Sequence, residues 1–490
     1  MHRSRILLVL LLPLAVLTGC REETLSHDSS LRIEFSCSKL SFDTVFTTIG
    51  SATKQVMVYN RNASAVELSQ VWLDNGSSSY FHINLDGENS LDQMGGMRIR
   101  GGDSLFMFVR IEVDPQNVNT PVNISDALHI LVNGNTCTLD LEAIGQDVVK
   151  LRAAAGRRID SINAHLNADK PYLLYDSLCV SGTFLMDAGA RLYMHDKATL
   201  VLNGDVQLNG TLTNNVSILG DRIDRLFDSV PYAYAAGGWN GIFLTPKQGT
   251  QPTYNIRYAS ITSGTNGLII LCKDKTLRPT LHLHNSRIHN HSQYGIVLDN
   301  VDDSIVNCEI SNCADHCLYL GGGNHVLVHT TVAAFYNHTT VRIQATPRKD
   351  VPAVMIDNKP DDDQADNCTW MLNCLVAGTR LRCLEFADTP AEPYPGRFVG
   401  NYLQCDSVPR HNTDSNTYGT RDQADAIFVQ SFYRYREYKY YNFRLANLSP
   451  AGEVADSLTA VHFPTDRLGL DRRPTAERKA DPGCYRFSAQ

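Results

Sequence analysis

The feature that most restricts the fold of this chain is a 22-residue repeat in its second half. Segments that begin at Leu283, Ile305 and Leu327 share one order of apolar and polar residues, and equivalent positions differ by 22. The repeat has no helical periodicity, and a unit of this length cannot bury its own apolar face. Successive units must therefore stack, with these three side chains in one inward column. The repeat predicts a β-solenoid in which each coil contributes short parallel strands.

A column of asparagines falls at the bend between two strands of each coil. Asn285 and Asn307 are one repeat apart, and His329 takes the next position. The column resembles the asparagine ladder of right-handed parallel β-helix proteins, whose stacked amides hydrogen-bond to one another. This resemblance implies a right-handed parallel β-helix over residues 170–450. The run Asp481-Pro482-Gly483-Cys484-Tyr485 resembles the closing motif of many such proteins, which implies that residues 451–490 form a capping module over the last coil.

Residues 31–149 are expected to form a separate domain of short strands. The stretch 127–143 contains two short strands around Asn133-Gly134, which is a hairpin signal. About seven short strands with regular turns are typical of an immunoglobulin-like β-sandwich. The segments 42–46 and 143–147 also resemble the first domain of a family of bacterial surface lipoproteins in which a β-helix follows. The predicted fold is therefore all-β, with a β-sandwich before the β-helix.

The first 19 residues have the features of a secretory signal peptide. Basic residues precede a short apolar run, which ends in Leu17-Thr18-Gly19-Cys20. This tetrapeptide resembles the bacterial lipobox, in which the cysteine receives a diacylglycerol and becomes the new N-terminus. The resemblance implies a lipid anchor on Cys20, a polar tether over residues 20–30 and attachment to the outer membrane. Glu22-Glu23 resembles a surface-export signal, which favours the outer face.

Charge and cysteine spacing exclude several classes of partner. The net charge is −8 and no basic stripe is present, so nucleic acid is not an expected partner. The chain has 13 cysteines but no C-x-x-C motif, and no metal site is expected from their spacing. Cys308, Cys313 and Cys317 are interpreted as packing residues. Whether Cys37 and Cys137 form a disulfide is left open.

Enzymes with a parallel β-helix mostly cleave acidic polysaccharides, and the hydrolases among them use carboxylates on adjacent coils. On the second strand of each coil we expect Val297, Tyr319 and Arg342 to point outward, which gives no carboxylate ladder. Asp303 and His325 are 22 residues apart and form the candidate acid–base pair, because they would stack in neighbouring coils. A surface ion pair or a solvated turn is the favoured alternative for these two residues.

A candidate glycan-binding segment lies near the end of the repeat region. Residues 431–441 are rich in aromatic and basic side chains, and Tyr433, Tyr435, Arg436 and Tyr438 are the candidate contacts. Aromatic faces stack on sugar rings, and arginine can meet acidic sugars. The alternative is a strand and loop that pack against the cap.

No cofactor is expected. The insertion that interrupts the repeat contains Asp361, Asp362 and Asp363, and such acid-rich loops can bind calcium through oxygen ligands. The spacing does not fit an EF-hand, so a solvated loop is the favoured interpretation.

These features rank three hypotheses for function. The first is a non-enzymatic surface lipoprotein, whose sandwich is a spacer and whose β-helix binds polysaccharide or another surface macromolecule. The second is a polysaccharide lyase or glycoside hydrolase on the same β-helix, acting on acidic polysaccharide. The third is a purely structural role in the envelope. One fold hosts many functions, so the groove chemistry must decide among them.

Overall fold

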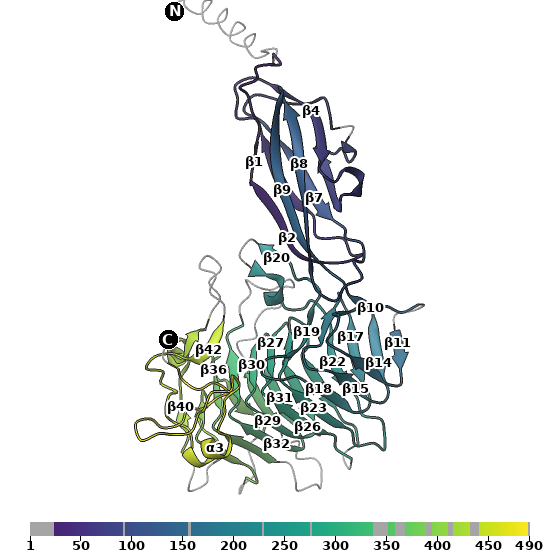
Figure 1. The fold of residues 1–490 in the computed structure, drawn as a ribbon. Helices are drawn as coiled ribbons and strands as arrows, with labels where there is room; N and C mark the ends of the chain where they lie inside the picture. The colour runs from purple at the N-terminus through teal and green to yellow at the C-terminus, as the bar shows by residue number, and fades with distance from the viewer. Residues whose placement is uncertain are drawn as a thin grey trace, which may run out of the picture. The chain divides into compact units, whose positions relative to one another are not determined.

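The structure is a computed structural model that describes residues 24–91, 94–154, 158–227, 230–274, 277–336, 351–357, 368–388, 394–409, 415–431 and 441–488. The chain divides into two compact units, residues 1–147 and 148–490, and each has its own apolar core (Figure 1). In these ranges no helix combines the length and the apolar character that crossing a membrane requires.

The first unit is a β-sandwich of a five-stranded and a four-stranded sheet. Its strands alternate buried and exposed side chains, so the inner faces of the two sheets form the core. The predicted hairpin is confirmed, and its turn residues Asn133 and Gly134 both have positive φ angles, 49° and 82°. Cys37 and Cys137 are free thiols. The strands are, in sheet order, β2 (Lys39–Phe46), β9 (Asn135–Gln146), β8 (Val122–Val132), β4 (Val66–Leu73) and β6 (Met97–Ile99), then β1 (Glu34–Phe35), β3 (Lys54–Tyr59), β7 (Ser104–Ile111) and β5 (Phe81–Leu85).

The second unit is a parallel β-helix, as predicted. Its described residues form three long parallel sheets, named here sheet I, sheet II and sheet III, with 11, 9 and 9 strands (Figure 1). Each coil adds a strand to each sheet. The register confirms the repeat, because Leu283, Ile305, Leu327 and Met371 are aligned in neighbouring strands and all are buried.

The strands of the three sheets are short, mostly three to five residues. Sheet I contains β10 (Val149–Leu151), β13 (Tyr172–Leu174), β16 (Arg191–Met194), β19 (Val216–Gly220), β24 (Ala259–Thr262), β27 (Arg287–His291), β30 (Glu309–Cys313), β33 (Thr331–Ala334), β36 (Leu375–Gly378), β39 (Tyr402–Leu403) and β40 (Thr417–Tyr418). Sheet II contains β11 (Arg158–Ser161), β14 (Ser177–Val180), β17 (Thr199–Leu202), β22 (Gly241–Leu244), β25 (Leu268–Leu271), β28 (Ile296–Asp299), β31 (Leu318–Gly321), β34 (Val354–Asp357) and β37 (Leu384–Phe386). Sheet III contains β12 (Ala164–Leu166), β15 (Phe184–Met186), β18 (Val206–Asn209), β23 (Thr253–Arg257), β26 (Thr280–His284), β29 (Asp302–Val306), β32 (Asn324–Val328), β35 (Cys368–Leu372) and β38 (Arg397–Val399).

The asparagine column sits at the corner between sheets III and I, where the chain must turn sharply. Asn285, Asn307 and His329 have φ angles of 51°, 54° and 46°, a left-handed conformation that asparagine tolerates better than most residues. The stacked amide bonds implied by the resemblance are not what holds Asn307. Its amide nitrogen donates to the carbonyl of Thr465 at 3.0 Å, and its amide oxygen accepts from Arg472 at 2.7 Å. The column therefore anchors the C-terminal segment.

The C-terminal segment packs along the side of sheet I. Buried Glu309 accepts hydrogen bonds from Arg287, Ser311 and Tyr485, and the backbone nitrogen of Cys484 donates to the hydroxyl of Thr331. These contacts reach β30 and β33, several coils before the last one, so the segment covers more than the final strand edges. The remaining short elements are β20 (Arg225–Phe227), β21 (Val230–Pro231), α2 (Ala424–Ile427), β41 (Phe428–Gln430), β42 (Asn442–Leu445) and α3 (Ser457–His462).

Candidate functional site

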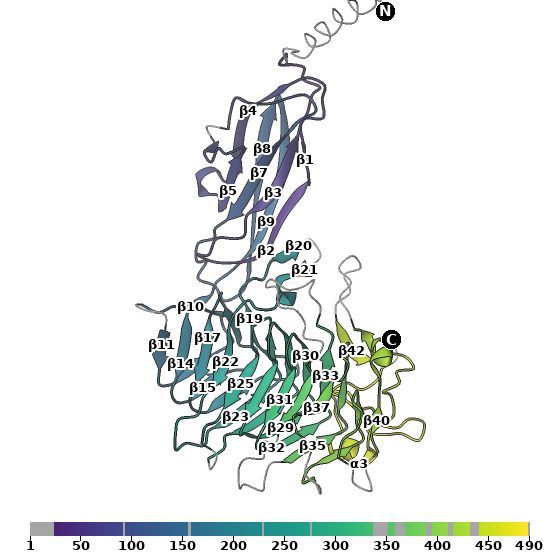
Figure 2. The same cartoon turned by 180° about the vertical axis from the view of Figure 1, so that it is seen from behind.

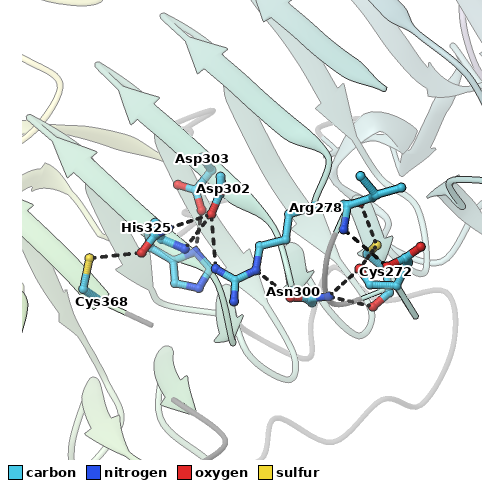
Figure 3. Close-up of polar contacts among 10 residues, drawn as sticks. Cys272, Arg278, Asn300, Asp302, Asp303, His325 and Cys368 are labelled. Carbon is cyan, nitrogen blue, oxygen red and sulfur yellow. Dashed lines mark hydrogen bonds and ion pairs between the residues drawn. The ribbon is translucent and has the colours of Figure 1, made fainter. Parts of the chain in front are cut away.

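The predicted pair Asp303 and His325 does meet, but inside the β-helix. The two residues are register partners in β29 and β32, and Nδ1 of His325 contacts Oδ2 of Asp303 (Figure 3). Their side chains are 0% and 1% exposed. The favoured interpretation of a surface ion pair or solvated turn is therefore wrong. It failed because strand positions alternate between core and solvent, and both residues fall on the core side.

The pair belongs to an inward polar column in an otherwise apolar core. Tyr254 and Leu281 precede Asp303 in register, and Thr369 follows His325. Burial raises the pKa of Asp303, although the contact with His325 acts in the opposite direction. Within the described part of the chain, the remaining atoms Oδ1 of Asp303 and Nε2 of His325 have no hydrogen-bond partner. A pair enclosed in this way does not face a bound polymer, so its contribution is to the interior of the fold.

A second polar network braces the corner between sheets II and III. The Nε of Arg278 donates to the amide oxygen of Asn300 at 2.9 Å, and a guanidinium nitrogen lies 3.6 Å from Asp302. Asn324 donates to the same carboxylate from the next coil, and the thiol of Cys368 donates to Asn324 (Figure 3). Asp302 is therefore held in place by its neighbours and serves to fix the turn.

The groove that best fits a ligand lies on the outer face of sheet II. Its volume is about 380 Å³. Strands β22, β25, β28 and β31 stack side by side there (Figure 2), and alternate residues of each strand point outward. The floor is apolar and the rims are amide and aromatic, and the lining residues are Phe243, Asn266, Ile269, Leu271, Gln293, Tyr294, Val297, His316 and Tyr319.

Aromatic rings form a row along this groove. The rings of Tyr294 and His316 stack with centroids 6.1 Å apart and planes at 25°, and His316 and Tyr319 are 5.9 Å apart. His316 is fixed by a 2.7 Å contact between its Nδ1 and the carbonyl of Pro352. Tyr319 lies close over Gly321, because a Cβ atom at Gly321 would come within 2.7 Å of the ring. The glycine thus lets the tyrosine ring lie over the sheet.

Two carboxylates stand next to this row, and sequence reasoning missed both. The hydroxyl of Tyr319 donates to Oδ2 of Asp357 at 2.6 Å. Asp299, Gly321 and Asp357 are aligned in β28, β31 and β34, so the two acids occupy one outward column two coils apart. Burial, followed by the hydrogen bond with Asp357 and the charges of Asp357 and Asp299, raises the pKa of Tyr319. The groove therefore combines aromatic faces with negative charge.

The carboxylates were missed for two reasons. The sequence analysis considered one outward position per strand, at Val297 and Tyr319, whereas a four-residue strand presents two. It also assigned the following coil to residues 340–343, whereas the partner of β31 is β34 and Met355 faces outward beside Tyr319. Arg342 was therefore the wrong outward residue. Alternation applied to every strand position would have found Asp299.

A second hollow, of about 770 Å³, adjoins the groove and shares Leu271 with it. Its lining includes Lys247, Lys273 and Asp274. Leu271 is 45% exposed, so the apolar floor continues from one hollow to the other. Together they give an extended surface rather than an enclosed pocket.

The other predicted site residues lie outside the described ranges. These are the lipid attachment residue Cys20, the glycan candidates Tyr433, Tyr435, Arg436 and Tyr438, and the calcium candidates Asp361, Asp362 and Asp363. Among the residues that the structure describes, no group of three or more His, Cys, Asp or Glu side chains is arranged to hold a metal ion.

Comparison with known proteins leaves function to the geometry. No protein-family model matches the chain. No curated protein matches it either. Among solved structures, it is similar over 23% of its length to a family 123 glycoside hydrolase from Clostridium perfringens that acts on glycolipid glycans, with 12% identity, 25% of that chain covered and a TM-score of 0.18. It also matches the ASH/PapD-like domain of human CEP192 at 10% identity, with 26% of this chain and 92% of that chain covered and a TM-score of 0.17. The chain thus spans a quarter of the length of that hydrolase.

Proposed function

We propose that this protein is an exported lipoprotein, anchored through Cys20 to the outer membrane, whose β-helix binds a glycan chain in the groove of sheet II. The observation that carries the proposal is the row of Tyr294, His316 and Tyr319 beside an apolar floor. Sugar rings have one apolar face, so they stack on aromatic side chains, and their hydroxyls bond to amide and carboxylate rims. The groove is open along the coils, as an extended polymer requires.

The groove replaces the segment around Tyr433 as the first place to test. The full-length protein is titrated with a panel of oligosaccharides, and Tyr319→Ala is compared with the unchanged chain. We expect Tyr319→Ala to weaken binding at least tenfold. Phe106→Ala is the matched control, because Phe106 is a 50% exposed aromatic residue of the other unit. Undiminished binding by Tyr319→Ala would place the site elsewhere.

A glycoside hydrolase in the same groove is the second candidate. Asp299 and Asp357 share an outward column and are separated by two strand spacings, about 9.6 Å between backbones. Inverting hydrolases hold their two carboxyl groups roughly 6.5–9.5 Å apart, which leaves room for a water molecule. Appearance of reducing ends that Asp299→Asn and Asp357→Asn abolish would establish hydrolysis. Binding without product favours the non-enzymatic proposal.

A further inference from the structure

We infer that the groove of sheet II selects amine-bearing sugars, such as glucosamine polymers, over acidic ones. This inference rests on the proposed glycan-binding function and names its ligand class. It follows from the charges on the groove, from the geometry of Tyr319 and from the position of the nearest lysines.

The charges around the groove are negative. None of the described residues that line it is lysine or arginine, and Asp299 and Asp357 flank the Tyr319 hydroxyl. A uronate or sulfated sugar placed on this row would bring like charges together at the groove surface. An ammonium group would instead meet a carboxylate with little competition from protein cations.

The geometry of Tyr319 suits an ammonium group as well as a sugar face. The ring lies over Gly321 and offers its negative face to the groove, and cations are attracted to such faces within about 6 Å. The hydroxyl of Tyr319 occupies one acceptor position on Asp357, and a carboxylate has about four such positions. The hydrogen bond therefore fixes the carboxylate while leaving it able to accept from a second donor.

The adjoining hollow limits how far this selectivity extends. Lys247 and Lys273 line that hollow rather than the aromatic groove, and Asp274 lies beside them. Substituting these lysines changes the charge near the groove without touching the aromatic row. Lys247→Gln and Lys273→Gln are therefore matched charge controls for the two aspartates.

The test uses three oligosaccharides of equal length with the full-length protein. They are a β-1,4-glucosamine hexamer, its N-acetylated counterpart and a galacturonic acid hexamer, titrated calorimetrically at low and at high salt. We expect the amine form to bind at least tenfold more tightly than the N-acetylated form at low salt. High salt should reduce that difference severalfold, because the charges at an open groove are screened. The galacturonic acid hexamer should bind least.

Variants separate the inference from the proposal beneath it. The double variant Asp299→Asn/Asp357→Asn should remove most of the advantage of the amine form and leave binding of the N-acetylated form within about twofold. The lysine controls should keep the advantage. Equal binding of the amine and N-acetylated forms, or tighter binding of the acidic hexamer, would overturn the inference but leave glycan binding standing. Absence of binding to all three hexamers and to every member of the panel would overturn both.

Discussion

Two regions of the β-helix carry an acid beside an aromatic or imidazole ring, and they differ in which way the side chains point. In sheet III, Asp303 and His325 face the interior and are enclosed. In sheet II, Tyr319 and Asp357 face outward and border a groove. The two arrangements come from neighbouring coils and similar residue types. The contrast shows that strand parity, rather than residue identity or repeat spacing, decides which group can meet a ligand.

The largest expected effect comes from breaking the interior pair. Asp303→Ala leaves His325 without its partner in the core, and loss of one partner of a buried pair costs about 3–5 kcal/mol. We expect the free energy of unfolding of the β-helix, measured by chemical denaturation, to fall by that amount. The double variant Asp303→Leu/His325→Leu should cost less than Asp303→Ala, since no buried group is left unpaired. Glycan binding under native conditions should be unchanged in both.

Acid should destabilise the interior and spare the groove geometry. Burial lowers the pKa of His291 to about 4 from 6.5 in the unfolded chain, so the folded state holds this residue neutral. Its contribution to stability is complete above pH 6.5 and is lost as the pH falls toward 4, by about 3 kcal/mol. Burial lowers the pKa of His289 and His329 in the same direction.

The measurement is the unfolding free energy between pH 7 and pH 4. His291→Phe should reduce the slope of this curve, whereas His462→Gln, at an exposed position, should not. An unchanged slope in His291→Phe would mean that other groups carry the acid sensitivity.

Changes in the groove should affect binding and leave stability almost untouched. Tyr319→Phe removes only the hydroxyl that orients Asp357, so we expect binding of the glucosamine hexamer to weaken about threefold to tenfold, or about 1 kcal/mol. The melting temperature should shift little, because the side chain is on the outer face. A large loss of stability would show that Tyr319 is structural.

The smallest effect is expected at Gly321. In Gly321→Ala the new methyl would meet the Tyr319 ring at 2.7 Å, so the ring must tilt away from the sheet. We expect binding to weaken by about twofold to threefold, as a ring contact is repositioned rather than removed. Tyr319→Ala/Gly321→Ala should bind no more weakly than Tyr319→Ala alone. An additional loss in the double variant would show that Gly321 acts independently of the ring.

The fold was largely predictable because it is written as a period. Leu283, Ile305 and Leu327 repeat every 22 residues, and one strand register follows from them. The groove was less predictable, because outward side chains are set by the parity of each strand, and β34 follows an insertion that moves it away from the period. Asp357 therefore could not be aligned with Asp299 by counting. The pairing of Asp303 with His325 was predictable from spacing, while their enclosure depended on which face each strand presents.

The most direct test of the account is a crystal structure of the full-length protein with the β-1,4-glucosamine hexamer bound. The account predicts a sugar ring on the face of Tyr319, with an amine of the hexamer near Asp357 or Asp299. A hexamer bound instead at residues 431–441, with the groove of sheet II empty, would contradict it.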